Sequence, residues 1–220
     1  MVRLTGMAAA VCLILAGTAR AQEMAPELAQ APAADPAAEA RGVSQAVTAA
    51  ELARWGRDRS DPGALIMAAR LLAEVPVRVE GDEAPMLTPG ALLDQAAAVA
   101  GGNTAVLDAI ERLRAAGTRG VISSPFGRGP VFIVKQIDPR ETYWFEVQAR
   151  GGEVLRIAAI GDGDTNIDLT VRDSEGVLVC RDGFGDHYPV CTTQPRADGR
   201  LRIDIVNRGE IWTRVQILTN

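Results

Sequence analysis

The sequence predicts an α+β multidomain protein, in which a small all-α part made of two helical hairpins precedes an antiparallel, jelly-roll-like β-sandwich. Three observations support this prediction: apolar residues at helical spacing between residues 43 and 117, eight short alternating segments after residue 130, and turn-forming clusters between those segments. Nothing of helical length separates the eight segments, so they are all expected to pair antiparallel.

Residues 1–21 have the pattern of a secretory signal peptide. Arg3 precedes an apolar run from about Met7 to Ala16, and Ala19-Arg20-Ala21 has the small-x-small form of a cleavage site. The run is shorter than the roughly 20 apolar residues that span a bilayer, although a retained anchor is the alternative interpretation. Cleavage before Gln22 would give a periplasmic or secreted protein with no membrane insertion.

Residues 22–42 are rich in alanine, proline and acidic residues and show no apolar periodicity. This composition is typical of a flexible linker. We expect the linker to space the folded part of the chain from the point of export.

Residues 43–117 form the expected helical domain. Asp61 (or Ser60) before Pro62, and Thr88 before Pro89, match the pattern of an N-cap followed by a proline in the first turn. Asn103 is the expected cap of the last helix, which ends near Gly117.

Two of the helical stretches resemble each other at an offset of about forty residues, which is weakly similar to tetratricopeptide- or Sel1-like helical repeats. Solenoids usually need three or more repeats, and two are visible here. A small four-helix bundle is therefore the favoured alternative.

A turn-rich link at residues 118–130 leads into the expected sandwich domain, residues 131–220. Each expected strand alternates apolar and polar residues over five to eight positions. The strands are expected at VFIVKQI, TYWFEVQA, EVLRIAAI, IDLTVRD, VLVCR, YPVCTT, LRIDIV and WTRVQIL.

Two cysteines remain once Cys12 is lost with the signal peptide. Cys180 and Cys191 form an even pair in what would be an oxidising compartment, which favours a disulfide over two free thiols. The short loop that it would close corresponds to about 2–3 kcal/mol of stabilisation on the chain-entropy model.

The last ninety or so residues resemble the bacterial pre-peptidase C-terminal domain, a jelly-roll-like sandwich that follows secreted peptidases. The resemblance lies in YWFEV (Tyr143–Val147), GGEVLRI (Gly151–Ile157), DTNIDLTVRD around Asp168, the spacing of the two cysteines, and GRLRIDIVNRGE followed by WTRVQI. It implies an accessory domain that aids secretion or stability, or that binds a polymeric substrate.

Closely spaced acidic residues raise the hypothesis of a calcium site in a sandwich loop, because Ca²⁺ binds six to eight oxygen ligands. A helix–loop–helix calcium loop is excluded, because Ile167 occupies the position that requires glycine and Asp173 the position of the bidentate glutamate. The alternative is that these side chains bond to the backbone in turns and at a strand entry. The candidate ligands are Asp162, Asp164, Asn166, Asp168, Asp182 and Asp186.

Trp144 and Glu146 are candidate ligand-binding residues. On a two-residue alternation they share one face of their strand, and Tyr143, Phe145 and Val147 share the other. An exposed tryptophan beside a carboxylate would suit a sugar or a peptide. The alternative is that Trp144 covers the edge of the sandwich or packs against the helices.

Charge and motifs narrow the function class. The net charge of −5 argues against nucleic acid and anionic membranes as partners. A single histidine, His187, and no nucleophile elbow leave no catalytic constellation, and calcium is the one cofactor left open. We therefore expect a non-catalytic binding or accessory protein of the cell envelope, with a protein or polysaccharide partner. The alternatives are a secreted hydrolase that uses the carboxylates between Asp162 and Asp186, and a calcium-stiffened stability module.

Overall fold

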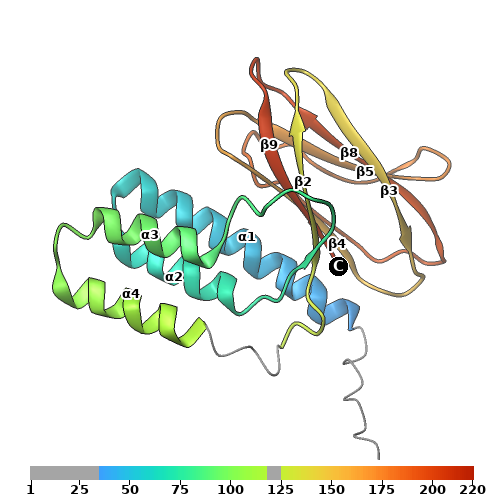
Figure 1. The fold of residues 1–220 in the computed structure, drawn as a ribbon. Coiled ribbons are helices and arrows are strands. Elements are labelled where there is room, and N and C mark those ends of the chain that lie inside the picture. The colour runs from blue at the N-terminus through green and yellow to red at the C-terminus, as the bar shows by residue number, and fades with distance from the viewer. Residues whose placement is uncertain (1–34, 118–124) are drawn as a thin grey trace, which may run out of the picture. The chain divides into compact units, whose positions relative to one another are not determined.

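The computed structural model describes residues 35–117 and 125–220; the predicted signal peptide, most of the predicted linker and residues 118–124 lie outside this part of the chain. Four helices precede most of the strands (Figure 1). The helices are α1 (Pro36–Arg59), α2 (Pro62–Ala73), α3 (Pro89–Val99) and α4 (Thr104–Gly117). Among the described residues, none of the helices combines the length and the apolar character needed to span a bilayer.

The strands of the described part run from β1 to β9. They are β1 (Arg78–Val79), β2 (Val131–Ile137), β3 (Thr142–Ala149), β4 (Leu155–Gly161), β5 (Ile167–Asp173), β6 (Leu178–Asp182), β7 (Val190–Thr193), β8 (Gly199–Asn207) and β9 (Thr213–Thr219). Each of the eight predicted strands is present, with ends that differ from the predicted ones by at most two residues.

Helix starts follow the sequence pattern of a cap and a proline. The Asp61 carboxylate accepts hydrogen bonds from the backbone of Gly63 and Ala64, and the Thr88 hydroxyl accepts one from Ala91. The same pattern at Asp35-Pro36 begins α1 inside the segment that was expected to be linker. Alanine-rich sequence has a high helix propensity, and burial of its alanines under the rest of the fold stabilises the helix there.

The strands pair as in one long hairpin that has been rolled up: β2 with β9, β3 with β8, β4 with β7, and β5 with β6. Two further pairings, β4 with β9 and β5 with β8, complete the sheets. The resulting orders are β1-β2-β9-β4-β7 and β3-β8-β5-β6. The predicted antiparallel jelly-roll sandwich is confirmed.

One strand pair is parallel, and it includes a short strand outside the eight that were predicted. The two-residue strand β1 pairs with β2 in parallel, with Arg78 opposite Val131 and Val79 opposite Phe132. A parallel pair requires a long crossover, and α3 and α4 lie between β1 and β2 in the chain. The pairings among the eight predicted strands are all antiparallel, as expected; β1 was not predicted, because two residues are too few to show any alternation.

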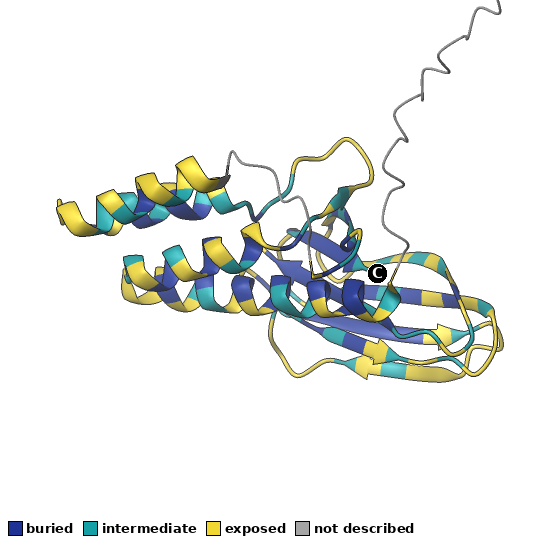
Figure 2. Cartoon of the chain, turned by 90° about the horizontal axis from the view of Figure 1, so that it is seen from below, coloured by how far each residue is buried: buried dark blue, intermediate teal, exposed yellow. Residues whose placement is uncertain are grey.

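The five-stranded sheet is covered on both faces. Toward the four-stranded sheet, Ile157, Ala159 and Ile217 join the core of the sandwich. On its other face, Phe132, Val134 and Leu218 share a core with the helices. Buried residues accordingly lie where helices and strands face one another, and exposed residues lie on the outer sides (Figure 2).

The helices form one layer on this sheet, and the predicted helical repeat is not confirmed. The helix α1 has 24 residues whereas α3 has 11, so the two hairpins are unequal. Polar contacts also tie the helical part to the sheet: the buried Gln216 side chain of β9 accepts hydrogen bonds from the backbone of Met86 (2.9 Å) and Leu87 (3.4 Å). The segment before α3 is thereby fixed to the sheet.

Candidate functional site

Strand β3 is an edge strand of the four-stranded sheet, and its two faces differ. Trp144 and Glu146 point outward and are exposed, while Tyr143, Phe145 and Val147 are half-buried against the sandwich core. Trp144 leaves 53% of its surface exposed. The predicted alternation therefore holds, with the tryptophan on the solvent side.

Side chains of β8 hold Trp144 in place. The Arg202 guanidinium carbon lies 4.5 Å from the centre of the Trp144 ring, close enough for a cation–π interaction. Its Nε donates a 2.8 Å hydrogen bond to the Asp204 carboxylate, whose other oxygen lies 3.8 Å from Arg172 on β5. The outer face of the sheet thus presents an aromatic ring within a network of arginines and one aspartate.

Glu146 lies between two concavities. One, of about 400 Å³, is polar, and it opens on the outer face where Glu146 pairs with Arg200 at 3.4 Å. The other, of about 270 Å³, is mostly apolar and lies between β3 and the edge of the five-stranded sheet. The polar one is lined by Glu146, Arg172, Asp173, Ser174, Gly176, Arg200 and Arg202, and the apolar one by Glu80, Val131, Ile133, Tyr143, Phe145, Glu146, Val147, Ile217 and Thr219.

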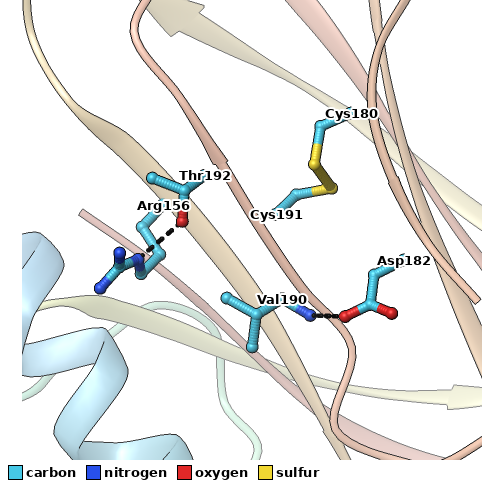
Figure 3. Close-up of a disulfide and its surroundings, with 6 residues drawn as sticks. All are labelled: Arg156, Cys180, Asp182, Val190, Cys191 and Thr192. Atoms are coloured by element: carbon cyan, nitrogen blue, oxygen red, sulfur yellow. Dashed lines mark hydrogen bonds between the residues drawn. A yellow bond between two sulfur atoms is a disulfide. The ribbon is translucent and has the colours of Figure 1, made fainter. Parts of the chain in front are cut away.

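The predicted disulfide between Cys180 and Cys191 is confirmed, with a Cα–Cα distance of 5.9 Å (Figure 3). It joins β6 of one sheet to β7 of the other and closes the loop between them. Beside it, the Val190 amide donates to the Asp182 carboxylate (2.8 Å), as Figure 3 shows. One side of the sandwich is therefore covalently closed, on the side away from β3.

Asp168 is the most buried of the candidate calcium ligands, with 4% of its surface exposed. Its Oδ2 accepts hydrogen bonds from Arg208 Nη2 (2.7 Å) and Nε (2.9 Å) and from Arg181 Nη2 (3.2 Å). A Cβ added at Gly183 would come within 3.0 Å of the same carboxyl group. Asp168 therefore serves as an acceptor for two arginines and is packed against the loop backbone.

The other candidate aspartates bond mainly to nearby backbone. Asp162 accepts from the Thr213 hydroxyl (2.7 Å) and the Arg214 amide (2.9 Å), and Asp186 accepts from the Tyr188 amide (3.0 Å). Asp164 is exposed, and its own amide donates to Asp162. The bonds from the Asp164 amide to Asp162 and from the Tyr188 amide to Asp186 match the alternative in which the acidic residues stabilise turns, whereas Thr213 and Arg214 belong to the distant strand β9.

The described residues contain no group of three or more His, Cys, Asp or Glu side chains placed to hold a metal ion. Three buried polar atoms near the acidic loop lack a partner among them: Thr165 Oγ1, Asn166 Oδ1 and His187 Nε2. His187 Nδ1 lies 3.0 Å from the Thr165 carbonyl, and because a carbonyl oxygen can only accept, Nδ1 donates this hydrogen bond. Ordered water is the usual partner of such atoms.

Tyr188 lies in the loop closed by the disulfide, and its environment changes the acidity of its phenol. Burial raises the pKa of its phenol, and the nearby Arg54 and Arg57 partly oppose this effect. The loop is thereby in contact with α1, whose residues line the core against which Tyr188 packs.

Sequence reasoning missed one feature of the β3 site and one exposed residue elsewhere on the surface. Arg200 and Arg202 alternate with Leu201 and Ile203, so their outward position was readable, but their placement beside β3 depends on a strand pairing more than fifty residues apart. The second is Phe184, which is 95% exposed in the disulfide-closed loop. The flanking Gly183 and Gly185 were the local sign of a tight turn there.

No family model and no curated protein matches the chain. Solved structures that are similar to its C-terminal part include the pre-peptidase C-terminal domain of a collagenase from Bacillus anthracis, with 5% identity and a TM-score of 0.36 over 40% of this chain and 87% of that one. The Yersinia pseudotuberculosis-derived mitogen has 10% identity and a TM-score of 0.34 over 42% and 85%. PliG of Aeromonas hydrophila, a periplasmic inhibitor of g-type lysozyme, has 13% identity and a TM-score of 0.31 over 41% and 86%. Likenesses of this degree carry no information about function.

Proposed function

We propose that the protein is an exported, non-catalytic binding protein of the cell envelope, and that a protein or polysaccharide partner binds at strand β3. The observation that carries this proposal is the exposed Trp144 ring, held by Arg202 on an edge strand and next to Glu146, which lines a concavity on either side.

An exposed tryptophan supplies a large flat apolar surface, and a guanidinium supplies donors in a fixed plane. Aromatic and arginine side chains contribute most of the binding energy in many interfaces. Because Asp204 and Trp144 both hold Arg202, the pair is ordered before a partner arrives. Such preorganisation lowers the entropic cost of binding.

The polar groups of this face favour binding over catalysis. Glu146 is paired with Arg200, and Asp204 with Arg202 and Arg172. A general acid or base must lie within hydrogen-bond reach of the substrate atom with which it exchanges a proton, whereas these two carboxylates are directed at neighbouring guanidinium groups. Export is supported by the disulfide, a type of bond that persists in oxidising compartments.

Glycan and peptide arrays probed with the full chain test the proposal. We expect specific binding that falls at least tenfold in Trp144→Ala. Phe184→Ala is the matched control, because it removes an aromatic ring that is more exposed and lies away from β3, in the loop between β6 and β7; its binding should equal that of the wild type. The absence of binding on both arrays, or equal loss in both variants, would contradict the proposal.

A further inference from the structure

The two sheets have four edge strands, and three of them carry features that prevent pairing with another chain. The strands β1 and β7 have two and four residues. The register between β5 and β6 shifts at Val171 and Arg172, and β6 ends on Arg181 and Asp182. Short length, an irregular register and charge are the usual protection of an exposed edge.

The fourth edge, β3, lacks these protections. It has eight residues, TYWFEVQA, with no proline, glycine or lysine and with one charge, Glu146. Its pairing with β8 runs without a shift from Thr142 to Ala149. Within the described part of the chain β3 has a paired neighbour on one side, so the outward-facing backbone groups along about 26 Å of strand are available to pair.

A groove lies directly beside this free edge. The half-buried side chains of Tyr143, Phe145 and Val147 form one wall of the 270 Å³ concavity, and Ile133 and Ile217 of the five-stranded sheet contribute to the other. The disulfide joins the two sheets on the opposite side of the sandwich, whereas the concavity lies between them on this side. Alternate side chains of a strand placed next to β3 would enter the groove, because side chains alternate between faces.

The charges around the groove indicate what kind of strand fits. Its lining contains two carboxylates, Glu80 and Glu146, and no basic residue; Glu146 also pairs with Arg200 at 3.4 Å on the outer face. Lys135 stands nearby, with its ammonium 5.8 Å from the centre of the Tyr143 ring. The whole chain carries a net charge of −5, so a basic partner is also favoured at longer range.

We propose that β3 binds an extended segment of a partner protein as an added antiparallel or parallel strand, with apolar residues at alternate positions and lysine or arginine among the others. This inference rests on the proposed function and specifies its partner as a polypeptide. Backbone hydrogen bonds to β3 would supply affinity, and the groove would select the apolar positions. The remaining side chains of the added strand would lie beside Trp144 and Glu146.

A second copy of the chain fits this edge less well. Pairing β3 with its own symmetry mate would bring Glu80 and Glu146 of both copies to one interface, and each copy carries net negative charge. Like charges in one interface are unfavourable. Self-association through β3 is therefore an outcome that the test must be able to detect.

The test uses the full chain and a panel of ten-residue peptides in which Val, Ile, Phe or Tyr alternates with Lys or Thr. Each peptide has a scrambled counterpart of the same composition. The best binder is also made in two N-methylated forms, one methylated at the odd residues and one at the even residues. Methylation blocks backbone pairing along one edge of the peptide and leaves its side chains in place.

Two variants accompany the peptides. Val147→Lys puts a charge into the groove, and Gln148→Lys puts the same charge on the next residue, which faces outward. Circular dichroism and melting verify that both variants are folded. Should Val147→Lys fail to fold, the two methylated peptides still decide the matter with the wild-type protein.

Strand addition predicts that an alternating peptide binds at least tenfold more tightly than its scrambled form, and that one methylated form loses at least tenfold while the other keeps its affinity. Val147→Lys should lose at least tenfold and Gln148→Lys less than threefold, and amide hydrogen exchange should slow at residues 142–149. Equal binding of both methylated forms, or no peptide binding, would overturn the inference.

Two further outcomes separate this inference from the proposed function. A dimer in sedimentation experiments that Val147→Lys dissociates assigns the edge to a second copy and overturns the peptide partner. A glycan that binds in a Trp144-dependent way while no peptide binds overturns strand addition and leaves the binding function standing. A loss of all binding on arrays and to the panel rejects both.

Discussion

The guanidinium of Arg202, on strand β8, stacks on the ring of Trp144, on the neighbouring strand β3. Trp144 lies directly opposite Asp204 in the pairing of β3 with β8, so Arg202, two residues away, reaches the ring diagonally. Asp204, whose side chain is 15% exposed, holds the guanidinium through a 2.8 Å bond. The Asp204 carboxylate thus contributes to the orientation of the exposed ring through Arg202.

This arrangement predicts an energetic coupling between Trp144 and Arg202. In a double-mutant cycle of Trp144→Ala and Arg202→Ala we expect a coupling of about 0.5–1 kcal/mol, the usual range of an exposed cation–π pair. Urea unfolding of the four proteins measures it. Arg200→Ala is the matched control, since Arg200 pairs with Glu146 instead, and its effect should add to that of Trp144→Ala. Additive effects for Arg202→Ala would show that the stacking has no energetic role.

Asp168 is expected to be the aspartate of the acidic loops that matters most for stability. Asp168→Ala removes the common acceptor of Arg181 and Arg208 from a buried position, which should lower the free energy of unfolding by about 1.5–3 kcal/mol. Asp164→Ala, at an exposed position, should change it by less than about 0.5 kcal/mol. Equal effects of the two substitutions in urea unfolding would contradict this account.

Calcium is expected to leave the melting temperature unchanged. The oxygens of Asp162, Asp168 and Asp182 already accept hydrogen bonds from protein groups, so a cation would have to displace them. A ligand that binds the native state alone raises stability, and extracellular calcium sites have dissociation constants of about 10⁻⁴–10⁻³ M. Melting in about 10 mM calcium and in chelator tests this. A higher midpoint in calcium that Asp164→Ala abolishes would favour the calcium site.

Much of the sandwich could be predicted because strand alternation is a local signal. The residues of β3 alternate strictly, and this alone put Trp144 and Glu146 on one face. The residues around Trp144 could not be predicted in the same way, because Arg202 is brought to it by a pairing between distant segments. A site formed by residues of several strands depends on how those strands pair, and a single sequence does not give this pairing.

At the start of α1, amino-acid composition gave the wrong expectation although a local signal for a helix was present. The composition of residues 36–42 is that of a linker, yet Ala38 and Ala40 are each 3% exposed. Alanine has no polar atom or periodic pattern to mark such burial in the sequence. The Asp35-Pro36 cap was the local sign of a helix, and it carries the same signal that identified Asp61-Pro62.

The disulfide is expected to contribute about 2–3 kcal/mol to stability, because Cys180 and Cys191 are separated by 11 positions in the chain. The Cys180→Ala/Cys191→Ala double variant should lose this amount in urea unfolding. The wild-type protein should lose a similar amount in reductant, whereas reductant should not affect the variant. Mass spectrometry of the oxidised protein should find no free thiol at either position. Two free thiols in the protein isolated from an oxidising compartment would contradict the assignment.

Because the pKa of Tyr188 is raised in the folded state, we expect the protein to lose stability at alkaline pH. Burial raises the pKa of its phenol in the folded state above the value of about 10 in the unfolded chain, so the folded state holds this proton more tightly. The contribution of Tyr188 is therefore complete below about pH 10 and is lost as the pH rises through the folded pKa. The stability difference between the wild type and Tyr188→Phe should shrink in urea unfolding as the pH is raised above about 10. Tyr143→Phe, at the other tyrosine of the chain, serves as the control for general alkaline destabilisation. If the difference in stability between the wild type and Tyr188→Phe stays constant from pH 8 to about 11, burial does not raise the pKa of the Tyr188 phenol.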